Sequence, residues 1–154
     1  MNRKLKALVF LFALMGFGAV QAASITYQTR DINAGVNNSD YKASWNAQTS
    51  ATTTGVISGF NMIWGGYNTF SHLAVNFSSG VSQMAFQLGT DAGYGGALYL
   101  DKVLVAKKTS DLWWAYDFNN TSQLLSSSAN ALTSGNHILE AFWAEGCCNG
   151  ANGG

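Results

Sequence analysis

Two carboxylates near the end of the chain, Glu140 and Glu145, are the first residues that could do chemistry. A glycosidase needs two carboxyl groups that face each other across a cleft, roughly 5 to 10 Å apart. The glutamates stand an odd number of positions apart in "NHILEAFWAE", which alternates like a strand. A regular strand directs such a pair to opposite faces, so only a β-bulge would bring them together. We therefore expect no glycosidase site here.

The histidines and cysteines offer no better pair of nucleophile and base. His72 and His137 fall in strand-like segments, and no serine stands in a strained glycine elbow beside either. Each histidine is expected to be a strand residue that is hydrogen-bonded to a neighbour. A cysteine nucleophile is not expected either, because adjacent thiols do not stay reduced in an oxidising compartment. The sequence therefore predicts a protein that is not an enzyme.

Four aspartates at or near loops are candidates for binding calcium, which takes several hard oxygen ligands from such loops. They are Asp91, Asp101, Asp111 and Asp117. The competing explanation is that aspartate is common in turns because it bonds to its own backbone. Asp91 and Asp111 are the better metal candidates, since each opens a loop rich in glycine or aromatic residues. No cofactor other than calcium is expected.

Aromatic side chains form the strongest cluster, in the runs "DAGYGG" and "SDLWWAYDF". The cluster comprises Tyr94, Trp113, Trp114, Tyr116 and Phe118. In a strand the two adjacent tryptophans point to opposite faces, so one can be exposed while the other is buried. An exposed indole is a surface on which a sugar ring stacks, with nearby Asp, Asn and Gln as partners for its hydroxyl groups. The alternative is that both indoles cover the open end of the fold.

Both cysteines, Cys147 and Cys148, lie in the closing run "AEGCCNGANGG". Adjacent cysteines can join into a small ring only if the peptide between them is strained or cis. So small a ring adds little stability through chain entropy, so its use would be local, as a rigid turn that presents Asn149. One alternative is a pair of intermolecular disulfides. The other is a metal-thiolate site, which is weakly supported because the sequence offers no matching set of further cysteines or histidines as ligands.

The first 22 residues have the composition of a signal peptide, with a basic start, an apolar run and small residues at the cleavage site. The apolar run is shorter than the roughly 20 residues that a membrane-spanning helix requires. The predicted mature domain, residues 23–154, has five basic and eight acidic residues and a net charge of −3. This charge argues against nucleic acid and anionic membrane surfaces as partners. Residues 23–154 are expected to form a single secreted domain without a transmembrane segment.

Short strands joined by glycine-bearing turns must position these residues. Alternation predicts strands over 24–32 and 136–145, and a hairpin in which 71–77 turns at "SSG" into 81–89. A second hairpin over 95–106 is predicted to turn at Asp101 and Lys102.

The only predicted helix lies within 39–51, with Ser39 or Asp40 as its N-cap. Tyr41 and Trp45, four residues apart, would share its buried face. Together the elements predict an all-β fold, an antiparallel β-sandwich of the jelly-roll type with one short N-terminal helix.

Several strings of the predicted mature chain resemble the CCXG family of secreted proteins, namely "DAGYGGALYLD", "DLWW" and "EGCCNG". Members of that family commonly carry a C-terminal PEP-CTERM sorting signal and occur in Gram-negative bacteria. The resemblance implies a location in the periplasm, on the outer surface or in the extracellular matrix, and it implies no activity. More distantly, the strand ending in "YLD" and the later "L-x-x-G-x-H" run are similar to the lectin-like β-sandwich of protective-antigen and flocculin-type domains.

The positions shared with the CCXG family indicate where a site lies. They are Asp91, Gly93, Tyr94, Gly95, Gly96, Asp101, Asp111, Trp113, Trp114, Glu145, Cys147, Cys148, Asn149 and Gly150. The ligand-binding residues expected among them are Asp91, Tyr94, Asp111, Trp113, Trp114, Glu145 and Asn149. A vicinal disulfide is expected between Cys147 and Cys148.

The chain departs from the family pattern in two places. Lys102 stands where relatives have glycine after the aspartate of "YLD", so a different turn type or backbone strain is expected. Relatives continue beyond "CCNG" with another strand and the sorting segment, so this chain is expected to be a fragment. If it is not, an open sheet edge would have to be covered, tolerated or paired with another chain.

The expected function is that of a non-catalytic surface or matrix protein that binds carbohydrate, with a glycan or exopolysaccharide as partner. The alternative is a self-associating subunit of a filament or surface layer, assembled by strand donation. A glycosidase is the least favoured hypothesis.

Overall fold

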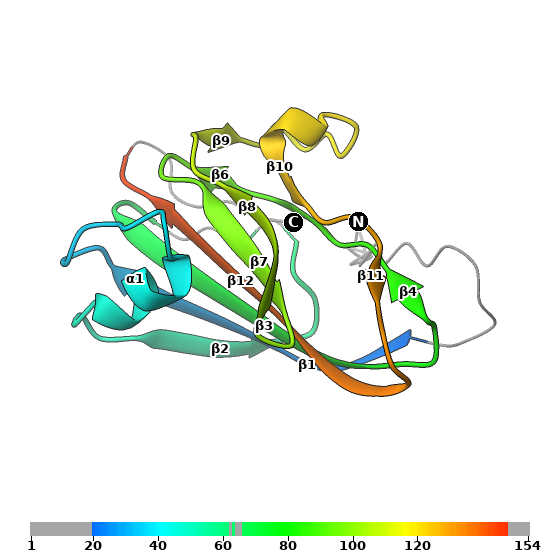
Figure 1. The fold of residues 1–154 in the computed structure, drawn as a ribbon. Coiled ribbons are helices and arrows are strands. Elements are labelled where there is room, and N and C mark those ends of the chain that lie inside the picture. The colour runs from blue at the N-terminus through cyan, green and yellow to red at the C-terminus, as the bar shows by residue number, and fades with distance from the viewer. Residues whose placement is uncertain (1–19, 62, 64–65, 148–154) are drawn as a thin grey trace, which may run out of the picture.

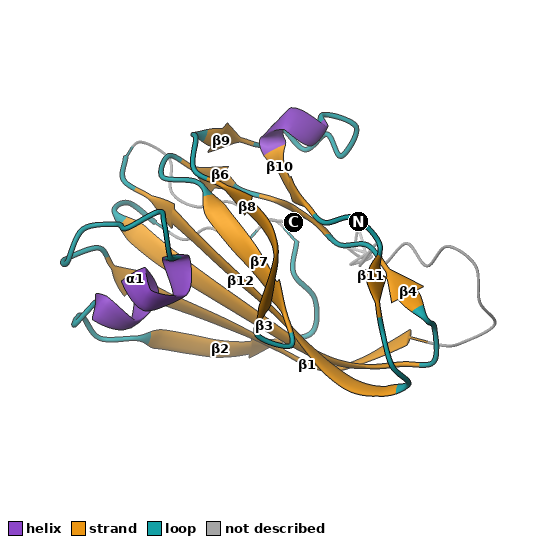
Figure 2. Cartoon of the chain, viewed as in Figure 1, coloured by secondary structure: helices purple, strands orange, loops and turns teal. Residues whose placement is uncertain are grey.

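The computed structural model describes residues 20–61, 63 and 66–147 of the chain. In chain order its elements are β1 (Val20–Asp31), α1 (Tyr41–Ala47), β2 (Thr53–Ile57), β3 (Thr69–Ser79), β4 (Gln83–Met84), β5 (Gln87–Gly89), β6 (Asp91–Ala92), β7 (Gly96–Leu100), β8 (Val103–Lys108), β9 (Leu112–Trp113), the 3₁₀ turn η1 (Thr121–Gln123), β10 (Leu124–Ser126), β11 (Asn130–Ala131) and β12 (Gly135–Glu145). Over these residues, the prediction of an all-β fold with one short helix is confirmed (Figure 2).

Six strands form one antiparallel sheet in the order β2-β1-β3-β12-β7-β8 (Figure 1). The predicted first and last strands are β1 and β12. The last strand is not an edge, because β12 pairs with β3 over its whole length and with β7 over residues 139–143. The edges of this sheet are β2 and β8.

Three short antiparallel pairs follow one another along the second layer: β4 with β11, β5 with β10, and β6 with β9. We call this interrupted two-stranded layer, which sets residues 83–92 against 112–131, the ribbon. Side chains of the ribbon and of one sheet face share a single apolar core, which includes Met84, Leu88, Leu98, Leu125 and Trp143. The sandwich is therefore made of one full sheet and one ribbon.

The predicted hairpin of 71–77 with 81–89 is wrong in its pairing. β3 is already paired with β1 on one side and β12 on the other, so neither edge is left for the segment that follows. That segment crosses to the ribbon instead. The predicted buried face is right, since the rings of Phe77 and Phe86 meet across the layers with centroids 6.0 Å apart.

The second predicted hairpin is confirmed as β7 and β8, which turn at Asp101 and Lys102. Both turn residues have positive φ, 49° for Asp101 and 72° for Lys102. Positive φ at both central positions is typical of a type I′ turn, where glycine is preferred at the second position. The expected strain at Lys102 is therefore present.

The predicted helix is α1, and its N-cap is Asp40, whose side chain accepts a hydrogen bond from the Ala43 N–H. Tyr41 and Trp45 are buried on its inner face, as the spacing predicts. They pack on the face of the sheet opposite the ribbon, against Phe70 and Phe142. The sheet is thus covered by the ribbon on one face and partly by α1 on the other.

An ionic group lies beneath α1. Lys42 forms an ion pair with Glu140, whose side chain is largely buried. His72 lies on the neighbouring strand with its Nε2 atom 3.4 Å from Glu140 Oε1 and its Nδ1 atom 2.9 Å from Gln28 Oε1. Burial lowers the pKa of His72 despite the opposing effect of the Glu140 carboxylate.

The predicted signal peptide falls largely outside the described residues. β1 begins at Val20, so it contains the last three residues of the predicted signal peptide, 20–22, and its register shifts between Ala22 and Ser24. Within the described part of the chain, no helix has the length and apolarity that a bilayer crossing requires. Cleavage, truncation and strand donation stay predictions.

Removing the Lys42 ammonium should destabilise the protein, because Glu140 would keep a largely buried charge without its cation. We expect Lys42→Met to lower the free energy of unfolding by about 1–2 kcal/mol, less than for a fully buried pair because Lys42 is partly exposed. Adding Glu140→Gln should recover most of the loss, as measured by urea unfolding. A single Lys42→Met variant as stable as the parent would contradict the pairing.

Candidate functional site

The aromatic and acidic residues of the sequence gather where β6 pairs with β9. Asp91 lies opposite Trp113 in this pair, and Ala92 lies opposite Leu112. The pair lies at one end of the molecule beside η1, at the top of Figure 1. The tight turn over residues 93–95 follows β6 directly, so Tyr94 belongs to the same end. We call this region the aromatic end.

The two adjacent tryptophans have opposite environments, as the strand pattern predicts. Trp114 is buried with 6% of its surface exposed, and its indole lies so close over Gly89 that a Cβ atom there would be 2.2 Å from Trp114 Cδ2. Trp113 is 69% exposed, which excludes the alternative that both indoles cover the fold. Its backbone N–H donates to Gln123 Oε1 at 2.6 Å, so η1 also holds the exposed residue in place.

Two more exposed rings surround the buried indole. Tyr116 and Phe118 each meet Trp114 edge to face, with ring centroids 5.0 Å apart. Tyr116 has φ = 61°, which is unusual for a bulky residue and is tolerated only where surrounding contacts fix the backbone. Both rings remain substantially exposed. The loop after β9 therefore presents aromatic surface to solvent while Trp114 anchors it.

Backbone hydrogen bonds fix the turn that carries Tyr94. The Tyr94 N–H donates to Ala144 O, and the Ala144 N–H donates to Gly95 O. The buried Tyr41 hydroxyl lies within hydrogen-bond distance of the Tyr94 and Lys108 carbonyl oxygens. Burial, with a smaller contribution from Tyr99, raises the pKa of Tyr41 to about 12, so its hydroxyl stays a donor.

Glu145 joins the 93–95 turn to the start of the closing segment. It is buried, and its two carboxylate oxygens accept hydrogen bonds from the Gly93 N–H and, at 2.7 Å, from the Cys147 N–H. The Tyr94 ring lies close to Gly146, where an added Cβ atom would be 2.7 Å from Tyr94 Cε2 and would force the ring to move. These contacts join the turn after β6 to the end of β12.

The carboxyl group of Asp91, at this end, has a strongly raised pKa. Its pKa is raised to about 6, mainly by burial and then by the nearby negative charges of Glu145 and Asp111. Asp91 therefore exchanges a proton in a mildly acidic range, unlike an exposed aspartate.

The structure brings together six of the nine predicted site residues, and the cysteine Cys147 at the margin of this group. The six are Asp91, Tyr94, Asp111, Trp113, Trp114 and Glu145. Cys148 and Asn149 lie outside the described residues, so the vicinal disulfide and the role of Asn149 stay predictions.

The four candidate calcium ligands separate into two kinds. Asp117 bonds to the backbone and side chain of Asn119, and Asp101 bonds to His137 and Ile138, as expected for aspartates that stabilise turns. Asp91 and Asp111 remain near one another. Among the described residues no group of three or more His, Cys, Asp or Glu side chains could hold a metal. Calcium binding stays a prediction.

The residues considered for catalysis are arranged as the strand pattern predicts. Glu140 lies on the α1 face of β12 and Glu145 on the other face, so they do not converge. Each histidine is hydrogen-bonded to a neighbouring side chain, His72 to Gln28 and His137 to Asp101.

Sequence reasoning did not single out two residues that shape the aromatic end, Gly89 and Gln123. Gly89 carries a signal in principle, since it stands in a strand-like run where a side chain would be expected. Gln123 carries none, because only the fold brings its carboxamide to the Trp113 N–H ten residues away.

No family model matches the sequence, and no curated protein matches it. Two solved structures are similar to it in backbone arrangement. One is the PA14 domain of the MpAFP antifreeze protein, at 12% identity and a TM-score of 0.48, over 88% of this chain and 79% of that one. The other is the PA14 sugar-binding domain from an RTX adhesin, at 12% identity and a TM-score of 0.49, over 84% of this chain and 86% of that one. The CCXG family stays a prediction.

Filling the space above Gly89 should dislodge the anchor of the aromatic end. We expect Gly89→Ala to displace the Trp114 indole and to lower the free energy of unfolding by about 1–3 kcal/mol, the cost of an overpacked core. Near-ultraviolet circular dichroism and urea unfolding would measure both effects. Gly55→Ala is the matched control, since nothing lies within 4 Å of its new Cβ. Equal effects of both changes would contradict the packing.

The raised pKa of Asp91 predicts a dependence of stability on pH. Between about pH 4 and pH 6 the Asp91 carboxyl binds more protons in the folded state than in the unfolded state, so its contribution to stability falls as the pH rises through this interval. The parent should therefore lose stability across this interval relative to Asp91→Asn, measured as urea midpoints from pH 4 to pH 7. The exposed Asp31→Asn is the control. A profile of Asp91→Asn parallel to that of the parent would contradict the shift.

Proposed function

We propose that the protein is a non-catalytic carbohydrate-binding module whose contact surface is the aromatic end. The observation that carries the proposal is the Trp113 indole, which is 69% exposed although its backbone is fixed by the β6–β9 pair and by Gln123. A flat indole carried on a fixed backbone gives the apolar face of a sugar ring a stacking surface.

Carboxylates beside the indole would orient the bound sugar. Asp91 stands opposite Trp113 on the neighbouring strand, and Asp111 precedes β9. Carboxylate oxygens accept hydrogen bonds from sugar hydroxyl groups, and a few such groups around an apolar surface supply orientation and specificity. In this proposal Glu145 acts indirectly and does not bind the sugar itself, because its oxygens hold the turn that carries Tyr94.

The charge around the indole favours neutral over acidic glycans. Asp91, Asp111 and Glu145 lie near enough for the last two to raise the pKa of the first. The nearby cation of Lys108 is turned toward the Thr121 and Ser122 carbonyl oxygens. An acidic polysaccharide would bring like charges together at this end. A surface or matrix location follows if the predicted signal peptide directs export.

Removing the Trp113 ring should abolish most of the binding. On an array of neutral and acidic glycans, probed with calcium and with chelator, we expect the parent to bind neutral glycans. Trp113→Ala should weaken this binding at least about tenfold, or ~1.4 kcal/mol, and Trp113→Phe less.

Val56→Ala is the control, because this apolar side chain is also strongly exposed and stands on the edge strand β2, which pairs with β1 and not with the ribbon. Two results would contradict the proposal: a parent that binds no glycan in either condition, and a Trp113→Ala variant that binds as tightly as the parent.

A further inference from the structure

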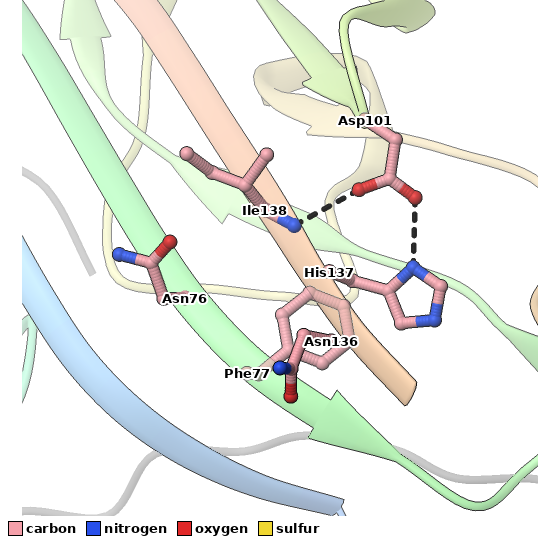
Figure 3. Close-up of a pocket in the computed structure, with 6 residues that line it drawn as sticks. All are labelled: Asn76, Phe77, Asp101, Asn136, His137 and Ile138. Carbon is pink, nitrogen blue, oxygen red and sulfur yellow. Dashed lines mark hydrogen bonds and ion pairs between the residues drawn. The ribbon is translucent and has the colours of Figure 1, made fainter. Parts of the chain in front are cut away.

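A hollow of about 390 Å³ lies at the start of β12, away from the aromatic end (Figure 3). It is lined by Asn76, Phe77, Asp101, Asn136, His137 and Ile138. Figure 3 shows that Asp101, from the turn between β7 and β8, reaches both His137 and the backbone of Ile138. The turn and the strand are therefore joined at one carboxylate.

His137 is buried, with 8% of its surface exposed, and both of its ring nitrogens face acceptors. Nδ1 lies 2.7 Å from Asp101 Oδ2, and Nε2 lies 2.9 Å from the Thr133 carbonyl oxygen. A neutral imidazole has only one N–H and would turn a lone pair toward one of these oxygens. The imidazolium satisfies both contacts, because both of its nitrogens are donors.

Asp101 docks a strained turn onto β12. Its N–H donates to Ile138 O at 2.9 Å, and its Oδ1 accepts from the Ile138 N–H at 3.0 Å. The side chain thus continues the β7–β12 ladder one step beyond Leu100, which pairs with Leu139. Asp101 and Lys102 both have positive φ, a conformation that is unfavourable for residues other than glycine. The contacts to β12 offset that cost.

We propose that Asp101, His137 and the Thr133 carbonyl form a pH-sensitive lock, which holds the β7–β8 turn against β12 while His137 is charged and releases it when His137 loses its proton. The lock is independent of carbohydrate binding at the aromatic end. Its release would free the turn and change the shape of the hollow.

Few charges other than Asp101 act on this histidine. From β3 the Phe77 ring lies 5.4 Å from the imidazole, and the other lining residues, Asn76, Asn136 and Ile138, are neutral. Lys102, beside Asp101 on the turn, is exposed. The hydrogen bond to Asp101, then that to Thr133, raises the pKa of His137. Burial by itself would raise the pKa of Asp101. The hydrogen bonds from His137 and Ile138 together have a larger effect in the opposite direction, so the pKa of Asp101 is lowered.

The two shifts define the pH window of the lock. Because the pKa of His137 is higher in the folded state, its stabilising effect is complete below the unfolded-state pKa of about 6.5 and is lost as the pH rises through the folded-state pKa. Because the pKa of Asp101 is lower in the folded state, its stabilising effect is complete above the unfolded-state pKa of about 4 and is lost as the pH falls through the folded-state pKa. The lock is therefore complete from about pH 4 to about pH 6.5 and opens on the alkaline side.

Nuclear magnetic resonance of the full chain tests the lock without any substitution. At pH 6 we expect ¹⁵N shifts of His137 that show both ring nitrogens protonated. Between pH 6 and pH 9, hydrogen-exchange protection of the Asp101 and Ile138 amides should fall at least about tenfold after correction for intrinsic exchange. A neutral His137 ring at pH 6, or unchanged protection, would overturn the proposal.

A stability series gives a second test. The chain has only two histidines, and His72, whose pKa is lowered, contributes with the opposite sign. The series therefore uses His72→Gln as its background. In that background the urea midpoint should fall from pH 6 to pH 9, and adding His137→Gln or Asp101→Asn should remove most of the fall. An equal fall in all three proteins would overturn the proposal.

Discussion

The pleat of β12 is the constraint on which the rest of the structure depends. The strand is held between β3 and β7, and its side chains alternate between two buried environments. Ala141 and Trp143 enter the core beneath the ribbon, whereas Phe142 and Ala144 lie beneath α1. A one-residue slip would exchange these environments for every side chain, so the register of this strand is strongly specified.

The same strand also holds the two polar features at its ends. His137, near its beginning, bonds to the β7–β8 turn, and Glu145, at its end, bonds to the turn after β6. Both groups are buried, and each has two hydrogen-bond partners within the protein. Buried polar groups satisfied in this way fix loops in one position, because breaking them leaves an unpaired donor or acceptor. The hydrogen bonds from β12 thus fix a turn at each end of the sandwich.

The interruptions of the ribbon produce the exposed aromatic surface. The ladder breaks between β5 and β6, where Trp114 packs over Gly89 and donates its backbone N–H to Thr90 O. Burying one indole at this break leaves the adjacent one on the outer face, since neighbouring side chains of a strand point in opposite directions. The exposure of Trp113 therefore follows from the burial of Trp114.

The sequence by itself determined the features that depend on near neighbours. Alternation marked the strands β1, β3, β7, β8 and β12, but not β2 or the strands of the ribbon after β6. Asp40 marked the start of the helix, and Asp101 with Lys102 marked the tight turn, because these signals are read within a few residues. The aromatic cluster and the opposite faces of Glu140 and Glu145 followed from the same two-residue period.

Only the tertiary structure decided how the strands pair and which side chains meet. Strands are joined by backbone N–H and C=O groups, which are the same in every residue. The alternation of side chains therefore could not show that β3 pairs with β12 and not with the segment after "SSG". The contacts of Glu145 with Gly93, Gln123 with Trp113 and Asp101 with His137 likewise join elements that are distant or on separate strands. Such contacts depend on the packing of two layers around one core, which no local pattern encodes.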